Sequence, residues 1–303
     1  MPTMPTAQRE PEIPGWTRLA GPRSRLGEVP IWNVTERALY WIDVLGGILH
    51  RVDHRGATTT WDLGQQVGSY CLTGSGQAIV ACLDGIYELD FGSGSQALLH
   101  PAPYDPAEHQ FNDGRCDPAG RFWVGTLNQP GTTEGSGAFW RLSRAGLVRV
   151  VEGVTVANGI AFSPDHGTMY LANRPGHEIL AFDYDLGTGT PRRRRRFAAL
   201  PEDAIPDGAA TDVDGGYWVA MFRSGTIHRY RPDGTLDRVL AAPTSRPTMV
   251  CFGGAELETM FVTTASHRFS DADPIEEADA GHVFACQPGA RGMPEPFFDA
   301  HVA

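Results

Sequence analysis

The chain has 303 residues, with 25 basic and 36 acidic side chains and a formal net charge of −11. This charge argues against a nucleic-acid-binding surface, so we expect no nucleic-acid partner. The 36 glycines and 23 prolines recur along the whole chain, and no long stretch places apolar residues at helical spacing. The composition therefore predicts an all-β protein with many short strands.

The cysteines and the N-terminus indicate the compartment. The five cysteines are scattered and form no CxxC pair, which argues against a disulfide framework or a zinc motif and favours a reducing environment. Residues 1–14 are polar and proline-rich, without the apolar segment of a signal peptide, and no run of about 18 apolar residues follows. We therefore expect a cytoplasmic protein with no membrane partner.

Six aromatic or aliphatic segments recur in chain order and are expected to be β-strands. Their centres lie near Tyr40, Ile79, Trp123, Tyr170, Trp218 and Phe261. Subtracting neighbouring positions gives spacings of 39, 44, 47, 48 and 43 residues. A period of this length is typical of a four-stranded propeller blade and too long for one turn of a helical solenoid.

Each of these segments is followed by a third strand and a more polar fourth strand. The third strands are expected at residues 48–53, 85–90, 137–143, 178–185, 225–231 and 281–287, and the fourth at 57–63, 96–100, 147–151, 192–200 and 236–241. Four antiparallel strands repeated six times predict a six-bladed β-propeller with a central channel. We expect residues 16–20 to add the outer strand of the last blade. Residues 16–303 then form a single domain after a flexible segment of residues 1–15.

The basic run from Arg192 to Arg196 falls on a predicted outermost strand. A run of this kind could bind an anionic partner. We interpret it instead as a solvated edge that discourages pairing with other sheets.

Four repeats carry an oxygen-bearing residue at a nearly constant distance before the centre of the second strand. These residues are Asn112 and Asp207, at an offset of 11, and Glu28 and Asn158, at an offset of 12. The remaining repeats place Ser69 and Met249 near this position. First strands line the channel of a propeller, so we expect the four side chains to converge at one mouth. Two carboxylates and two amides suit a hard divalent cation, Ca²⁺, Mg²⁺ or Mn²⁺, better than Zn²⁺.

A plainer explanation exists for each residue taken alone. Asn and Asp are common in turns and at the starts of strands, where they cap the backbone. Recurrence in four repeats favours a shared function instead. Glu28 supports this inference, because glutamate is a poor turn residue and a poor strand former.

The motifs around these positions carry a family resemblance. They read LGEVPIW (26–32) with LYWID (39–43), FNDG (111–114) with DPAGR (117–121), NGIAFS (158–163) and PDG (206–208). In combination and order they resemble the SMP-30/gluconolactonase/regucalcin family over about residues 16–300. The resemblance implies one divalent metal ion held by Glu28, Asn158 and Asp207, with Asn112 contacting the substrate or a metal-bound water.

The resemblance also implies an activity, the hydrolysis of a small-molecule sugar lactone to the aldonic acid. A divalent ion can polarise the lactone carbonyl, stabilise the oxyanion and lower the pKa of a bound water. By resemblance, Asp207 is also the general base, and Asn112 orients substrate oxygens. We interpret Asp113 as structural, supporting the turn or the neighbouring ligands.

Two substrate-side positions depart from the gluconolactone-type members. Gln110 stands where they carry an arginine, and residues 128–131 lack a glutamate that some members have. We therefore predict a lactonase without assigning gluconolactone as its substrate. Gln110, Arg174 and Arg223 are candidate substrate-binding residues, although each arginine could equally be a solvent-exposed loop residue. The same mouth is expected to carry Tyr104, His109, Phe222 and His267.

Two alternatives remain open at this point. A propeller site with one hard metal can also hydrolyse phosphoester or organophosphate bonds. A non-enzymatic calcium-binding propeller is the second alternative, although a site that leaves coordination positions to water suits catalysis better than buffering. The sequence predicts no particular oligomeric state.

Overall fold

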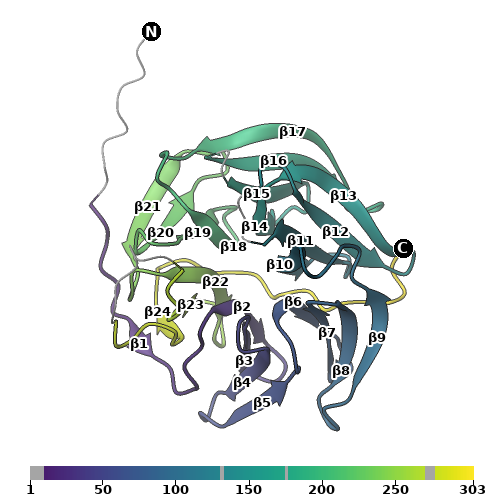
Figure 1. Cartoon of the computed structure of the whole chain (residues 1–303). Coiled ribbons are helices and arrows are strands. Elements are labelled where there is room, and N and C mark those ends of the chain that lie inside the picture. The colour runs from purple at the N-terminus through teal and green to yellow at the C-terminus, as the bar shows by residue number, and fades with distance from the viewer. Residues whose placement is uncertain (1–9, 130–132, 175–176, 270–276) are drawn as a thin grey trace.

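The computed structural model describes residues 10–129, 133–174, 177–269 and 277–303, and the side chain of Arg174 is not included. These residues form strands, turns and loops and contain no helix (Figure 1). The all-β class predicted from the sequence is confirmed. No helix in these ranges is long and apolar enough to cross a membrane.

Three sheets are antiparallel meanders in which each strand pairs with the next along the chain. Their strands are β2 (Gly27–Asn33), β3 (Ala38–Asp43), β4 (Ile48–Asp53) and β5 (Thr58–Asp62); β6 (Val67–Leu72), β7 (Gln77–Cys82), β8 (Gly85–Asp90) and β9 (Gln96–Pro101); and β18 (Pro206–Thr211), β19 (Tyr217–Met221), β20 (Thr226–Tyr230) and β21 (Leu236–Ala241). Each sheet follows the predicted four-strand order.

A fourth sheet has eight strands and joins two such meanders. Its strands are β10 (His109–Cys116), β11 (Phe122–Asn128), β12 (Gly137–Ser143), β13 (Gly146–Val154), β14 (Val156–Phe162), β15 (Thr168–Arg174), β16 (Glu178–Asp185) and β17 (Thr190–Ala199). A single residue pair, Leu127 on β11 with Val156 on β14, links the two halves. The repeat pattern does not predict this link, because it arises where the end of β11 meets the start of the neighbouring meander.

The last sheet is closed by the N-terminal part of the chain. It runs in the order β22 (Pro247–Gly253), β23 (Thr259–Thr264), β24 (Phe284–Cys286) and β1 (Thr17–Arg18). Thr17 pairs with Ala285 and Arg18 with Phe284, so the expected contribution of residues 16–20 is confirmed. Upstream, the N–H of Glu12 donates to the carbonyl of Val239 at 2.8 Å. Residues 1–9 of the predicted flexible segment lie outside the described residues.

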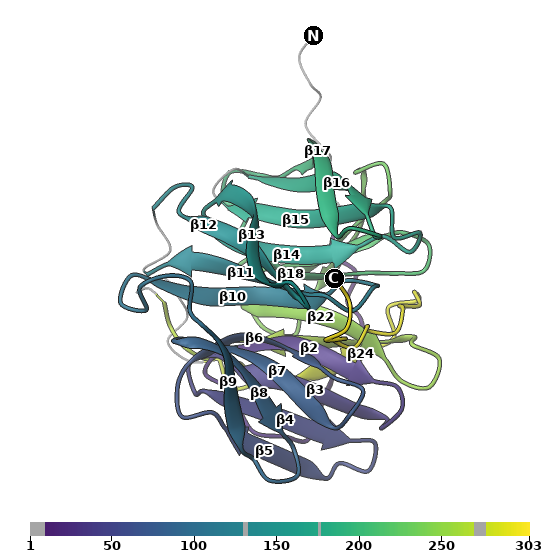
Figure 2. The ribbon, with the colours of Figure 1, turned by 90° about the vertical axis from the view of Figure 1, so that its right-hand side faces the viewer.

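The first strands of the repeats contact one another in a closed circle, in the order β2, β6, β10, β14, β18, β22 and back to β2. Figure 1 views this arrangement with the sheets spread around the centre, and Figure 2 shows β10, β14 and β18 layered side by side. The residues singled out in the sequence lie near the N-terminal ends of these strands. The circle therefore gathers them at one end of the molecule.

Buried aromatic side chains fix the sheets against one another. The Trp218 ring on β19 lies 6.1 Å from the Phe252 ring on β22, and the Tyr170 ring on β15 lies 5.2 Å from the Tyr217 ring on β19. Burying a large apolar side chain contributes roughly 1.5–3 kcal/mol. All five cysteines are free and buried, so among them no disulfide adds to this packing.

The basic run lies on β17, the outermost strand of its sheet, and its five arginines are exposed. Arg193 and Arg195 both pair with Asp183, the latter at 2.7 Å, and Arg194 pairs with Glu178 at 3.7 Å. The run is therefore a solvated sheet edge, as expected, and its effect on pairing with other sheets stays a prediction. Exposed pairs of this kind contribute little to stability.

Residues 292–303 form a strap across the opposite end of the circle from the predicted site, seen as the yellow trace through the middle of Figure 1. The strap begins with Gly292, which bridges to Asp212 after β18, and continues to Phe298, which bridges to Thr73 after β6. It then accepts a hydrogen bond at the Val302 carbonyl from the N–H of Arg144, at 2.8 Å. The strap therefore connects turns from three different sheets.

A buried aspartate holds the first hairpin of the fifth repeat. One carboxylate oxygen of Asp212 accepts from the N–H of Gly216 at 2.7 Å. The other accepts from the indole of Trp218 at 2.8 Å and from the guanidinium of Arg229 at 2.7 Å. Asp117 has the same role two repeats earlier, with an N–H···O contact of 3.0 Å to Arg121 and an ion pair of 2.9 Å with the same residue.

Replacement of this aspartate should destabilise the fold. Asp212→Ala leaves the buried Trp218 and Gly216 N–H groups without an acceptor, so we expect the free energy of unfolding to fall by about 2–4 kcal/mol. Urea denaturation followed by tryptophan fluorescence measures the change. Asp233→Ala is the matched control, because Asp233 also caps a turn, at 2.9 Å from the Thr235 N–H, but is exposed. Equal losses for the two variants would contradict the assignment.

Candidate active site

The predicted site residues lie where the first strands lose their regular pairing. In every first strand the register shifts near its N-terminal end: between Glu28 and Ile31, Val67 and Ser69, Asn112 and Gly114, Asn158 and Ala161, Pro206 and Ala209, and Pro247 and Met249. A β-bulge bends the strand and turns a side chain away from its regular direction. Six bulges in equivalent places therefore direct the residues at these positions toward the centre of the circle.

The backbone beside three site residues has positive φ. Val29 follows Glu28 with φ of 48°, Asp113 follows Asn112 with φ of 32°, and Gly159 follows Asn158 with φ of 64°. Glycine and aspartate tolerate this region, whereas a β-branched valine is strained there. Strain of this kind persists only where the surrounding structure enforces it. The direction of the Glu28 side chain is therefore imposed by the packing around Val29.

Glycines let neighbouring strands approach closely at this end. A Cβ added to Gly208, next to Asp207, would lie 2.3 Å from the Met249 side chain. A Cβ on Gly159 would lie 2.5 Å from the hydroxyl of Tyr217, which donates to the Gly159 carbonyl at 2.8 Å. Met249, at the expected position in the last repeat, thus fills space beside Gly208. These contacts fix how closely β14 approaches β19 and how closely β18 approaches β22.

A hydrogen-bonded chain links three of the four predicted residues. The Asn112 amide donates to the Asn158 side-chain oxygen at 2.5 Å and to the Ala157 carbonyl at 2.8 Å. The Asn158 amide donates in turn to Asp207 Oδ1 at 2.9 Å. This chain sets the orientation of both amides. It leaves one lone pair of the Asn158 side-chain oxygen available.

Glu28 interacts electrostatically with the carboxyl groups of Asp207 and Asp113. Burial among its neighbours raises the pKa of the Glu28 carboxyl well above its ordinary value, and the nearby Asp207 and Asp113 carboxyls raise it further. The Val29 N–H, 3.3 Å from Glu28 Oε2, lowers the pKa but does not offset these effects. Like charges therefore converge here in a poorly solvated place.

Asp113 is more closely involved than the sequence interpretation allowed. Its side chain is 5% exposed, Oδ2 accepts from the Ile160 N–H at 3.2 Å, and Oδ1 has no hydrogen-bond partner among the residues that the structure describes. Burial raises the pKa of Asp113 to about 6, although the Arg115 guanidinium opposes the shift. The residue supports its turn, as predicted, and also adds a third carboxyl beside Glu28. In the sequence, its position directly after Asn112 is the feature that could have indicated a place in the site.

The donors fit a hard divalent cation. Such ions take carboxylate, amide and carbonyl oxygens as ligands, and their charge offsets repulsion among converging carboxyls. Within the described ranges, no three His, Cys, Asp or Glu side chains form a metal-binding group by themselves. The amide oxygen of Asn158 would therefore complete the set with Glu28 and Asp207.

The candidate substrate-binding residues lie around this end of the circle, and the structure describes the side chains of some of them but not of others. Gln110 is half-buried on β10 two residues before Asn112, so the two side chains share a side of the strand. Arg174 ends β15 opposite Val156, and its side chain lies outside the described part. In the loop predicted to lack a glutamate, Asn128 donates to Thr133 Oγ1 at 2.9 Å, and residues 130–131 lie outside the described part.

Arg223 lies at the same end as Asp207. The N–H of the preceding residue, Phe222, donates to the Ile205 carbonyl at 2.9 Å across the hairpin. Arg223 is exposed, with φ of 67°, and its guanidinium lies 5.9 Å from the centre of the Phe222 ring. The Phe269 ring lies 5.9 Å from Phe222 and 4.8 Å from His267. An arginine and an aromatic group therefore border this end.

Arg246, three residues before Met249, is a buried cation that sequence reasoning missed. Its side chain is 2% exposed, and in the described part of the chain its Nε and one terminal nitrogen have no hydrogen-bond partner. A carboxylate oxygen of Glu277 lies 3.9 Å from the other terminal nitrogen. Its flanking residues, Ser245 and Pro247, gave no signal that the charge would be buried.

The pKa of Asp113 predicts how stability depends on pH in the metal-free chain. Because the folded-state pKa of about 6 exceeds the ordinary 3.8, the folded state holds this proton more tightly, and stability falls as pH rises from about 4 to 6. Asp113→Asn removes this penalty and suits positive φ, so it should be more stable than the parent by about 2–3 kcal/mol above pH 6. Below pH 4 the two proteins should match. Urea titrations with a chelator at pH 4–8 measure this, and a pH-independent difference would contradict it.

Comparison with known proteins identifies the family. Residues 26–266 match the SMP-30/Gluconolactonase/LRE-like region family. The 6-deoxy-6-sulfogluconolactonase of Pseudomonas putida is 40% identical over 279 residues, covering 91% of this chain and 95% of that protein. Pentonolactonase XacC of Haloferax volcanii is 31% identical over 290 residues, covering 92% and 96%.

A solved structure supports the fold. Regucalcin from Agrobacterium tumefaciens, described as a calcium-binding protein, superposes with a TM-score of 0.87 at 23% identity, covering 93% of this chain and 97% of that chain. At this identity the likeness concerns the fold alone. The family match and the identity to relatives over nine-tenths of the chain go further, and they confirm the resemblance found in the motifs. The chain belongs to the SMP-30/gluconolactonase/LRE-like family.

Proposed function

We propose that this protein hydrolyses a sugar lactone with the help of one divalent cation. The observation that carries the proposal is the linked group of Asn112, Asn158 and Asp207 with Glu28 beside it. Relatives named as lactonases support the reaction class. Glu28, Asn158 and Asp207 would hold the cation, with Ca²⁺, Mg²⁺ or Mn²⁺ preferred over Zn²⁺ because the donors are all oxygens.

The chain's own residues supply positioning and proton transfer. When bound, the cation would polarise the lactone carbonyl and favour deprotonation of water. The Asp207 carboxylate takes a proton from the water that attacks the carbonyl carbon. The ring C–O bond then breaks, and its oxygen takes up a proton to give the hydroxy acid. Because both N–H groups of Asn112 are used by Ala157 and Asn158, Asn112 presents its amide oxygen, which would accept a hydrogen bond from a substrate hydroxyl.

The proposal includes the architecture and the location. Counting the eight-stranded sheet as two blades, the closed circle of first strands supports a six-bladed propeller formed as one domain by residues 16–303. The five free, buried cysteines are compatible with a cytoplasmic location.

The substrate is proposed to carry an acidic group. The P. putida relative is named for a sulfonated gluconolactone. Gln110 replaces the arginine of gluconolactone-type members, so a cation that meets an acidic group would have to come from another position. Arg223 borders the site from the β19 side, and Arg174 ends the neighbouring β15. A guanidinium matches the geometry of a sulfonate or carboxylate.

A non-catalytic calcium-binding role is a second candidate, because the similar solved structure is described as a calcium-binding protein. It predicts cation binding without turnover of any lactone. Calorimetry with Ca²⁺, together with a lactone assay on the same preparation, separates the two roles.

The role of Asp207 can be tested by substitution. Asp207→Asn keeps the size and can still accept from Asn158 but loses the base, so kcat should fall by about 100-fold or more. Chelation should abolish turnover, and added cation should restore it. A pH-stat assay on a lactone panel measures both effects. Asp214→Asn, at the far turn of the same hairpin and exposed, is the control.

Two outcomes would contradict this assignment. Full activity of Asp207→Asn would remove the residue from catalysis. Faster turnover of a phosphotriester than of any lactone would instead favour organophosphate hydrolysis.

Recognition of an acidic group makes a second test. Arg223→Met should lower kcat/KM for a sulfonated lactone by about tenfold or more and leave the uncharged lactone nearly unchanged. Arg174→Met is measured in parallel to decide which arginine acts. A uniform loss across charged and uncharged lactones would reject charge recognition.

A further inference from the structure

The end of the circle opposite the candidate active site holds a cavity of about 400 Å³. It lies beside the C-terminal ends of three first strands, at Cys116 on β10, Phe162 on β14 and Thr211 on β18, and the strap residues 293–296 border it. Thr211 lies four positions after Asp207 on β18, which corresponds to about 13 Å along the strand. The cavity is therefore separate from the group around Asp207.

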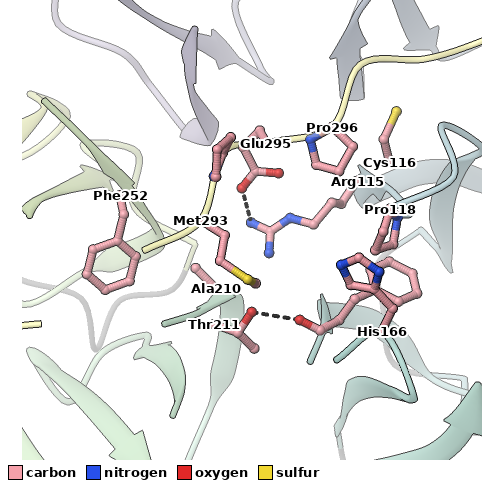
Figure 3. Close-up of a pocket in the computed structure, with 12 residues that line it drawn as sticks. Arg115, Cys116, Pro118, His166, Ala210, Thr211, Phe252, Met293, Glu295 and Pro296 are labelled. Atoms are coloured by element: carbon pink, nitrogen blue, oxygen red, sulfur yellow. Dashed lines mark hydrogen bonds and ion pairs between the residues drawn. The ribbon is translucent and has the colours of Figure 1, made fainter. Parts of the chain in front are cut away.

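The cavity has the composition of a small-molecule site. Phe162, Phe252, Met293 and the prolines of the strap make its walls mostly apolar, and few polar groups reach it. Its volume lies in the range of about 300–1,000 Å³ that is common for ligand pockets. Figure 3 shows the Arg115 guanidinium extending between Glu295, Met293 and His166.

Arg115 is the central polar group. Its side chain is 8% exposed, and one terminal nitrogen pairs with Glu295 Oε1 at 3.2 Å. Within the described ranges, no hydrogen bond to another residue is found for the rest of this guanidinium. A guanidinium has five N–H donors, and buried donors are normally satisfied. The remaining donors of Arg115 therefore require water or a ligand in the cavity.

The guanidinium of Arg115 offers N–H donors, and the carboxylate of Glu295 beside it offers an acceptor. A carboxylate can accept two hydrogen bonds from the free side of the guanidinium, while a hydroxyl on the neighbouring carbon can donate to Glu295. An uncharged polyol lacks the first group, and a simple fatty acid lacks the second. The C–H surface of a short carbon chain would contact Phe162, Phe252 and Met293.

We propose that this cavity is a second binding site, which takes a small hydroxy acid through Arg115 and Glu295. Aldonic acids belong to this class, so the product of the proposed reaction is one possible occupant. The site itself depends on the chemistry of the cavity and does not rest on the lactonase assignment. Because Glu295 already neutralises Arg115, we expect affinity in the millimolar range.

Calorimetry on the purified full chain with Ca²⁺ tests the proposal, using gluconate as the hydroxy acid and sorbitol as the matching polyol without the carboxylate. Gluconate should bind, and sorbitol should not. Arg115→Gln should weaken gluconate binding by about tenfold or more, as expected for loss of a charge-assisted pair. Arg144→Gln, an exposed arginine in a turn beside the same strap, should bind like the parent.

Two further variants keep the outcome decisive. Met293→Trp fills the cavity without changing its charges and should also weaken binding, so it decides the question if Arg115→Gln fails to fold. Asn112→Ala alters the active-site end and should leave this binding in place. Absence of gluconate binding, equal binding of sorbitol, or loss in Asn112→Ala with retention in Arg115→Gln and Met293→Trp would each overturn the proposal. None of these results depends on whether a lactone is hydrolysed.

Discussion

Burial of carboxyl groups at the centre of the strand circle is the constraint around which this molecule is built. Burial raises the pKa of Glu28 and of Asp113, and the nearby Asp207 and Asp113 carboxyls raise the pKa of Glu28 further. Such a cost persists only if the remaining structure offsets it. Packing between the sheets and the bulged, close-packed first strands supply that support, so the site is imposed by the fold as a whole.

The two ends of the first strands have different chemistry. At one end the oxygen donors lie on strands and are fixed by hydrogen bonds. Of the groups that could select a substrate, Gln110 lies on β10, Arg174 ends β15, and Arg223 lies in the segment after β19. Rigid elements hold reacting groups more precisely than loops, and loops tolerate change more readily. Specificity for the proposed lactone substrate could therefore change through residues such as Arg223 without disturbing Asn158 or Asp207. The opposite end is bordered by the strap and centres on Arg115.

Much of this arrangement could be predicted from local sequence patterns. Aromatic segments at a regular period predict the second strands, and the constant offset predicts that Asn112, Asn158 and Asp207 meet at one end of the molecule. The backbone strain at Val29, the pairing of Leu127 with Val156 and the contact of Arg115 with Glu295 could not be predicted in this way. Each depends on tertiary contacts that form only when the sheets pack, and sequence periodicity carries no information about those contacts.

The pairing of β1 with β24 has a consequence for the order of folding. Thr17 and Ala285 are 268 residues apart in the chain, by subtraction, and contacts between distant segments form late because their loop-closure entropy must be overcome. Each meander can form from local hairpins before then. The circle of first strands, and with it the meeting of Glu28 and Asp207, has to wait for closure. The proposed cation site should therefore be among the last features to appear during refolding, and a cation bound there should slow unfolding more than it speeds folding.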